Sequence, residues 1–152
     1  MEVREATSGD VAALAELIGR FFSEEGFGTS PAEVTVRMPE FLATHGNVAF
    51  LALDGDTAVG VSTVTSTYGL EFGRVGEIED LYVLPAHRGR GVATALLGHA
   101  MLWAREQGFD ALEVVVTPKD YAKKDRLVRW YARLGFADTG RVVLHYGPDA
   151  GI

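Results

Sequence analysis

Apolar positions along the chain follow two different periods, and each change of period coincides with residues that end a helix or a strand. Between residues 11 and 21 they recur every three to four positions, which predicts a helix capped by Ser8 and ended by the glycines at 26–28. Residues 30–33 have the order of a capping box with proline at the first helical position. A second helix is therefore predicted from there to about His45.

Segments rich in β-branched and aromatic residues occupy much of the remaining chain. Asp54-Gly55-Asp56 joins two of them and is typical of a hairpin turn. The predicted strands cover Met1–Thr7, Val48–Leu53, Thr57–Thr67, Glu77–Leu84, Leu112–Val116 and Arg141–Tyr146. Two more helices are predicted at Val92–Gln107 and Asp125–Leu134, each followed by a glycine. This order of elements predicts a three-layer α/β domain.

Length and composition narrow the class of protein. A chain of 152 residues predicts a single domain over residues 1–152, and the absence of cysteine excludes disulfides and an acyl-cysteine intermediate. The net charge of −7 argues against a general nucleic-acid-binding protein. No segment reads as a signal peptide or a membrane span, so the expected location is cytoplasmic. The four histidines lack the spacing of metal ligands, and no metal is predicted.

The most informative segment is a predicted strand, a glycine-rich turn and a helix within residues 80–97. Gly89 and Gly91 allow positive φ and a close approach to the backbone, and the free N–H groups of the following helical turn form an anion site. Arg88 and Arg90 add positive charge beside it. The pattern fits a pyrophosphate, although a plain strand-to-helix turn would have the same glycines. It is neither a P-loop nor a dinucleotide fingerprint, because the lysine of the first and the third glycine of the second are missing.

Two motifs in register resemble the GNAT family of N-acetyltransferases. Residues 88–93 match its Q/R-x-x-G-x-G/A motif, and residues 130–136 are similar to its L-Y-x-x-x-G-F ending. The resemblance implies a central mixed sheet of about seven strands flanked by about four helices, with acetyl-CoA as co-substrate. It assigns the cofactor to backbone groups of the strand, the turn and the helix start, namely Leu81, Tyr82, Val83, Arg88, Gly89, Arg90, Gly91, Val92, Ala93 and Thr94. It also implies that the fourth and fifth strands separate to admit the cofactor.

Acetyl transfer to an ammonium group requires a base, and the thiolate that leaves requires an acid. Glu79 is the expected base, since residues 79–83 resemble the diamine acetyltransferase branch, and Glu113 is the alternative by resemblance to the ribosomal-protein branch. Strand alternation puts Glu79 and Glu77 on one face and Asp80 on the other unless a bulge intervenes. The family resemblance makes Tyr131 the expected acid. Seven residues before it, Lys124 replaces an asparagine that contacts the cofactor in many members, and residues 117–123 look like an insertion.

Acidic and aromatic residues are the candidates for the acceptor site. Phe27, Tyr68, Glu77 and Tyr146 lie in segments that select the acceptor in this family, and their chemistry suits a cationic amine. The preferred acceptor is a small molecule of the polyamine or aminoglycoside type, with a peptide or protein amine second. The competing interpretations are a non-catalytic acyl-CoA-binding module and an enzyme for longer acyl chains. The final strands are also a candidate edge for a homodimer.

Overall fold

The computed structural model describes residues 1–118 and 120–147, which form two compact units. The first unit, residues 1–115, contains a five-stranded sheet and three α-helices. The second unit begins at Val116 and contains one α-helix. No helix among these described residues is long and apolar enough to cross a membrane. The single domain over residues 1–152 stays a prediction.

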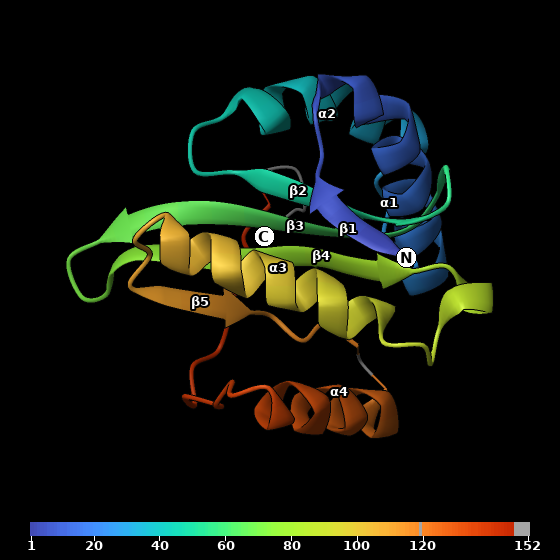
Figure 1. Cartoon of the computed structure of the whole chain (residues 1–152). Coiled ribbons are helices and arrows are strands. Elements are labelled where there is room, and N and C mark those ends of the chain that lie inside the picture. The colour runs from blue at the N-terminus through green and yellow to red at the C-terminus, as the bar shows by residue number, and fades with distance from the viewer. Residues whose placement is uncertain (119, 148–152) are drawn as a thin grey trace. The chain divides into compact units, whose positions relative to one another are not determined.

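The sheet has the order β1-β2-β3-β4-β5 and is antiparallel except for the parallel pair β4–β5 (Figure 1). Its strands are β1 (Glu2–Glu5), β2 (Val48–Asp54), β3 (Thr57–Gly69), β4 (Gly73–Val83) and β5 (Ala111–Val114). The helices are α1 (Val11–Glu25), α2 (Pro31–Ala43), α3 (Val92–Glu106) and α4 (Tyr121–Arg133). The mixed sheet and the helices are confirmed, and the element order matches the sequence pattern up to α4.

The predicted number of strands is wrong, because the described residues form five strands and not about seven. Residues 141–146 were expected to form the last strand, and they form none. A strand is stabilised by its ladder and by burial of one face, whereas Val142 and Leu144 here are 80% and 89% exposed. The homodimer edge was expected at the final strands, and the strand at residues 141–146 is therefore missing from it.

In the first unit the sheet lies between two apolar layers. Residues of α1 and α2 pack on one face, where Leu14 and Met38 share a buried cluster with Leu51 of β2 and Val61 of β3. The other face is covered by α3, which crosses in front of the sheet in Figure 1. There Gly60 of β3 is required by packing, since a Cβ at this position would lie 3.0 Å from the Leu96 side chain.

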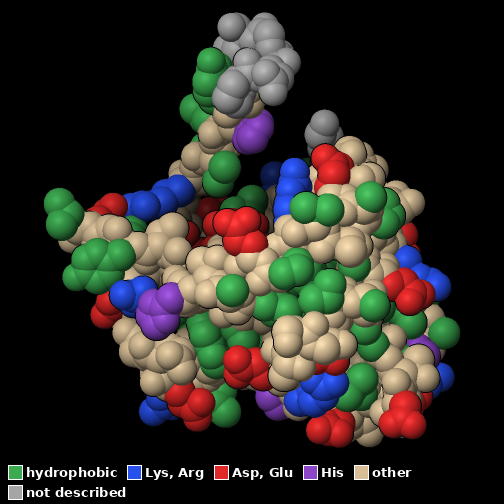
Figure 2. Space-filling model, turned by 90° about the horizontal axis from the view of Figure 1, so that it is seen from above, with side chains coloured by type: hydrophobic (Ala, Val, Ile, Leu, Met, Phe, Trp, Pro, Cys, Tyr) green, Lys and Arg blue, Asp and Glu red, His purple; other side chains and the backbone are tan. Residues whose placement is uncertain are grey.

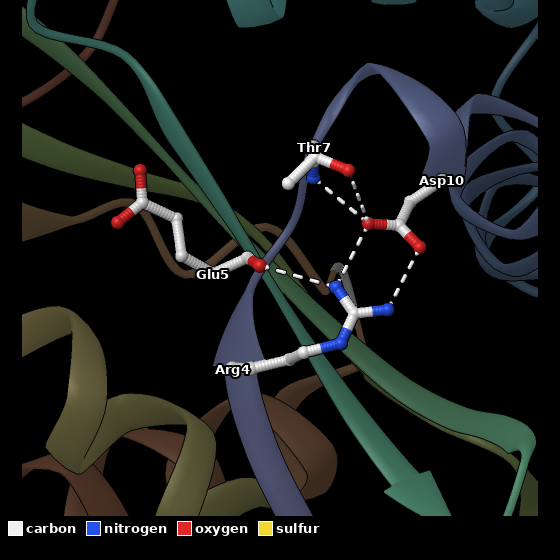
Figure 3. Close-up of polar contacts among 4 residues, drawn as sticks. All are labelled: Arg4, Glu5, Thr7 and Asp10. Atoms are coloured by element: carbon white, nitrogen blue, oxygen red, sulfur yellow. Dashed lines mark hydrogen bonds and ion pairs between the residues drawn. The ribbon is translucent and has the colours of Figure 1, made fainter.

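A charged contact holds the start of α1 to the end of β1. Asp10 accepts hydrogen bonds from both Nη atoms of Arg4 at 2.8 and 2.9 Å and from the Thr7 backbone N–H at 2.8 Å (Figure 3). These donors keep the pKa of Asp10 well below its usual range. The predicted cap at Ser8 is wrong, because residues 8–10 form a short 3₁₀ turn and the α-helix begins at Val11.

The second unit also differs from its sequence prediction at a helix start. Asp120 accepts the Lys123 backbone N–H at 2.8 Å, so α4 begins at Tyr121 and not at Asp125. Residues 121–123 of the expected insertion at residues 117–123 therefore form the first turn of a helix, and Lys119 within it lies outside the described residues.

Candidate functional site

The glycine turn has the backbone that an anion site requires. Gly89 and Gly91 have φ of 74° and 80°, and no atom lies within 4 Å of the Cβ position of either. Backbone conformation, and not crowding, is therefore what glycine provides here. Gly91 is the N-cap of α3, and its carbonyl accepts the Ala95 N–H at 3.0 Å. The N–H groups that precede Ala95 in this first helical turn have no intrahelical acceptor.

Strand β4 leaves its parallel partner partway along its length. The pairing with β5 runs from Val75 and Ala111 to Ile78 and Val114, whereas β4 continues to Val83. The predicted separation of these two strands is thus present in the first unit. It leaves the β4 backbone beyond Ile78 without a strand partner on the side away from β3.

The antiparallel ladder determines which β4 backbone groups face this gap. Leu84 donates its N–H to Val59 of β3 at 2.9 Å, so alternate residues from there turn their backbone groups toward β3. Tyr82 belongs to that set. Leu81 and Val83 turn their backbone groups the other way. Of the three strand residues expected to pair with the cofactor, two have the required direction and Tyr82 does not.

A β-bulge at Glu79 changes the face on which the next carboxylate lies. Val64 of β3 pairs with Ile78, and Thr63 pairs with Asp80, so Glu79 is the extra residue on β4. The bulge is the exception that the sequence prediction allowed, so Asp80 is not placed on the face opposite Glu77.

Hydrogen bonds from β3 confirm this arrangement of the acids. The Thr63 hydroxyl donates to Asp80 at 2.5 Å, and the Thr65 hydroxyl donates to Glu79 at 2.8 Å. Thr63 and Thr65 are two apart on β3 and thus share a face. Glu113 of β5 pairs with Glu77 in the parallel register, which places their side chains on one face as well. We call these four side chains the carboxylate cluster: Glu77, Glu79, Asp80 and Glu113.

Burial raises the pKa of two members of the carboxylate cluster. The pKa of Asp80 rises to about 6, mainly because the group is desolvated, with the Thr63 hydrogen bond acting in the opposite direction and the Glu79 charge adding to the rise. The pKa of Glu77 is raised by burial first and then by the charges of Glu79 and Glu113. Among the described residues, no group of three or more His, Cys, Asp or Glu is arranged to hold a metal ion.

Asp80 is the member of the cluster that sequence reasoning missed. Its carboxyl lines a cavity of about 150 Å³ in the first unit. The cavity is bounded by α1, α2, the segment between them and the sheet, and its lining is Ile18, Phe22, Thr29, Val34, Arg37, Met38, Phe41, Thr63 and Asp80. The sequence contained no distinct signal for Asp80, since Thr63 lies among other hydroxyl residues of the same strand, namely Ser62, Thr65, Ser66 and Thr67.

The four residues expected to bind the acceptor have different surroundings. Glu77 belongs to the carboxylate cluster. Phe27 follows α1 and packs against Phe21 and Phe22, with ring centres 5.9 and 5.5 Å apart. Tyr68 is exposed near the end of β3, where Arg74 lies over its ring at 5.7 Å. Tyr146 is exposed in the second unit. No contact recorded among the described residues joins Phe27, Tyr68 or Tyr146 to the carboxylate cluster.

Tyr131, the expected acid, lies in the last turns of α4. Its ring packs edge-on against Trp130 and Phe136, with ring centres 4.8 and 5.5 Å apart. Burial raises the pKa of Tyr131 to about 12. The phenol therefore keeps its proton at neutral pH, as a proton donor must.

Charges around the glycine turn differ from the sequence expectation. The Arg88 guanidinium forms an ion pair with Glu24 of α1 at 2.8 Å, so much of its charge is neutralised within the protein. Over the face drawn in Figure 2, basic side chains are interspersed among acidic ones and form no continuous basic surface. Besides its backbone N–H groups, the turn carries the exposed side chain of Arg90.

Comparison with known proteins identifies the family. Residues 11–136 match the acetyltransferase (GNAT) family. The chain belongs to this family. It is 34% identical over 121 residues to an aminoglycoside N(6')-acetyltransferase type 1 of Serratia marcescens, which covers 76% of this chain and 80% of that protein. The predicted class, an N-acetyltransferase that uses acetyl-CoA, is confirmed.

Solved structures of GNAT proteins have the same fold. The crystal structure of an aminoglycoside 6'-N-acetyltransferase of Acinetobacter haemolyticus superposes with a TM-score of 0.78 at 26% identity and covers 97% of this chain and 98% of that one. An acetyltransferase of Clostridium acetobutylicum solved with acetyl-CoA has a TM-score of 0.77 at 22% identity, with 95% of each chain covered. These matches confirm the α/β fold class.

Proposed function

We propose that this GNAT enzyme transfers an acetyl group from acetyl-CoA to a primary amine of an aminoglycoside, the 6'-amine being the first candidate. The observation that carries the proposal is the carboxylate cluster beside the point where β4 separates from β5. Several carboxylates at the mouth of a cofactor gap attract a polycationic acceptor and lower the free energy of an ammonium group there. The name of the Serratia marcescens relative supports the same acceptor class.

The cofactor contacts that we propose follow the backbone. Leu81 and Val83 turn their backbone groups into the gap. The Leu81 groups and the Val83 N–H would pair with the extended arm of acetyl-CoA, while the Val83 carbonyl accepts the Arg88 Nε–H at 2.8 Å. The N–H groups from Gly89 to Thr94 would bind its pyrophosphate, since they combine left-handed glycines with a helix start. The remaining predicted residues of the turn, Arg88 and Arg90, contribute backbone groups. Tyr82 contributes its ring to the core and not its backbone to the cofactor.

The chemistry that we propose is direct transfer. The free amine attacks the thioester carbonyl, the new C–N bond forms, and the C–S bond breaks. Glu79 takes the proton of the ammonium group, directly or through a water, because it is exposed at the bulge and oriented by Thr65. Tyr131 then donates its proton to the leaving thiolate, and the proton lost by the new amide nitrogen restores the Tyr131 phenol through solvent. Glu113 remains the alternative base, since it lies in the same cluster through its pairing with Glu77.

The acceptor is tested by thiol release from acetyl-CoA with a matched pair of aminoglycosides. One carries an amine at the 6' position and the other a hydroxyl, and we expect release only with the first. Spermidine and a lysine peptide complete the panel. If spermidine or the lysine peptide is turned over faster than the aminoglycoside, that compound and not the aminoglycoside is the preferred acceptor. Binding of CoA with no acetylation in the whole panel would favour a non-catalytic binding module.

The base is tested in the same assay with Glu79→Gln and Glu113→Gln. Loss of a general base lowers kcat by roughly 10²–10⁴-fold, and we expect that loss for Glu79→Gln alone. Tyr131→Phe should lower kcat by a similar factor without weakening CoA binding. A large loss for Glu113→Gln with an active Glu79→Gln enzyme would exchange the two roles.

A further inference from the structure

A carboxylate on α1 contacts the first residue of the glycine turn. Glu24 lies in the last turn of α1, and both of its carboxyl oxygens accept hydrogen bonds from outside the helix. The Tyr82 hydroxyl donates to Oε1 at 2.6 Å, and Nη2 of Arg88 donates to Oε2 at 2.8 Å. This contact joins three segments that are distant in sequence: the end of α1, strand β4 and the start of the turn.

Arg88 makes two further contacts that give its side chain a defined direction. Its Nε donates to the carbonyl of Val83 at 2.8 Å, and the guanidinium carbon lies 5.4 Å from the centre of the Tyr82 ring. A guanidinium is a planar group whose N–H bonds point in fixed directions. Because both Nε and Nη2 are hydrogen-bonded, the plane of the guanidinium is fixed. The Arg88 backbone, from which the turn starts, is restrained with it.

The helix gains little from an acid at this position. A carboxylate in the last turn lies beside the negative end of the helix dipole, and the last turn of α1 has no basic residue. Arg88 and the Tyr82 hydroxyl offset this repulsion from outside the helix. The interaction therefore stabilises the arrangement of turn, strand and helix more than it stabilises α1 itself.

The rest of the turn has few other supports among the contacts described. Space is open around the Cβ positions of Gly89 and Gly91. Val92, at the start of α3, is the next residue with a buried side chain. A binding loop that already has its bound conformation loses less entropy when the ligand arrives. The contacts of the Arg88 side chain with Val83 and Glu24 can hold the first residue of the turn in its bound conformation.

We infer that Glu24 is a positioning residue for acetyl-CoA, which acts through Arg88 to keep the glycine turn in the conformation that receives the pyrophosphate. The inference rests on the cofactor site proposed above. The contacts of Glu24 with Tyr82 and Arg88 place its carboxyl at the start of the turn. Its removal weakens cofactor binding and leaves the acetyl-transfer step unchanged.

The test is Glu24→Gln, measured by steady-state kinetics and by calorimetric titration with CoA. Loss of a hydrogen bond to a charged group is expected to raise KM for acetyl-CoA and Kd for CoA about tenfold, with kcat within about twofold. Glu16→Gln is the matched control, because Glu16 is exposed on the same helix and its loss changes the charge equally. The control should leave both constants unchanged. Equal melting temperatures would show that the variants are folded.

A double-mutant cycle tests whether Glu24 acts through Arg88. Arg88→Lys with Glu24→Gln should bind CoA no more weakly than Arg88→Lys alone, and fully additive losses would overturn the inference. Unchanged or tighter binding by Glu24→Gln would overturn it as well, since it would mean that Glu24 withholds Arg88 from the phosphates. Gly91→Ala separates the two proposals. If Gly91→Ala binds CoA normally, the proposed cofactor site is in the wrong place. If Gly91→Ala binds CoA weakly while Glu24→Gln binds it normally, only the role of Glu24 is wrong.

Discussion

The carboxyl of Asp80 provides a direct test of the bulged arrangement, because its environment predicts the sign of a stability change. In the folded chain its pKa is about 6, raised mainly by burial. In an unfolded chain an aspartate titrates near 3.9. The folded state therefore binds this proton more tightly, and the free energy of unfolding falls as the pH rises from about 4 to about 6. Asp80→Asn removes the titration and should stabilise the protein above that range.

The magnitude follows from the two pKa values. A difference of about two units corresponds to at most about 3 kcal/mol at pH 8, and about 1 kcal/mol of it is already present at pH 4.5. The free energy of unfolding of Asp80→Asn, relative to that of the parent protein, should therefore be higher at pH 8 than at pH 4.5 by about 2 kcal/mol. Asparagine is close to aspartate in shape, and its amide oxygen can still accept the Thr63 hydroxyl proton, so the hydrogen bond to β3 is retained.

Urea unfolding of both proteins at pH 4.5 and pH 8 measures this difference. The matched control is Glu106→Gln, which removes an exposed carboxylate at the end of α3 and should change stability by less than about 0.5 kcal/mol at either pH. A loss of stability for Asp80→Asn that is the same at both pH values would refute the reasoning. It would mean that folding does not raise the pKa of Asp80, so that the cost of burying the charge is compensated by its surroundings.

Three further substitutions test other parts of the structure. Gly91→Ala should raise KM for acetyl-CoA several-fold, because alanine at φ of 80° is strained by about 1–2 kcal/mol and would shift the helix start. Asp10→Asn should lower the free energy of unfolding by about 1 kcal/mol at pH 7. The pKa of Asp10 is depressed, so this difference should fade in acid, as urea titrations can show. Leu96→Ala should cost about 2–5 kcal/mol by the same measurement, since Leu96 is fully buried.

Elements that depend on contacts between residues close in sequence were predicted well. The hairpin at residues 54–56 and the capping box at residues 30–33 involve contacts within a few positions, and both are present, with Glu33 donating its N–H to Ser30 at 3.2 Å. Helix α3 was predicted within one residue because its apolar period and its flanking glycines agree. Where the signal was a single capping residue, as at Asp120, the start of the helix was missed.

Features that depend on distant partners were not predictable in this way. The sequence shows positive charge at Arg88, but its partner Glu24 is 64 positions away, so the neutralisation of that charge could not be inferred. The expected strand at residues 141–146 has the right composition, yet composition does not supply a neighbouring strand to pair with. The position of the glycine turn was predictable for the opposite reason, since the positive φ of Gly89 and Gly91 is a local requirement for glycine.

The bulge at Glu79 accounts for two features of the candidate site at once. A bulge bends a strand and increases its twist, and the parallel pairing of β4 with β5 stops at Ile78, the residue just before the extra one. The same extra residue resets the alternation, so Asp80 joins the face of Glu77. A substitution at position 79 would remove a carboxylate and keep both effects. Deletion of residue 79 would remove the bulge and leave a regular ladder in which Asp80 still pairs with Thr63 on the face of Glu77. It would take away the carboxylate and the bend together, so comparison with the substitution separates the structural contribution of Glu79 from its chemical one.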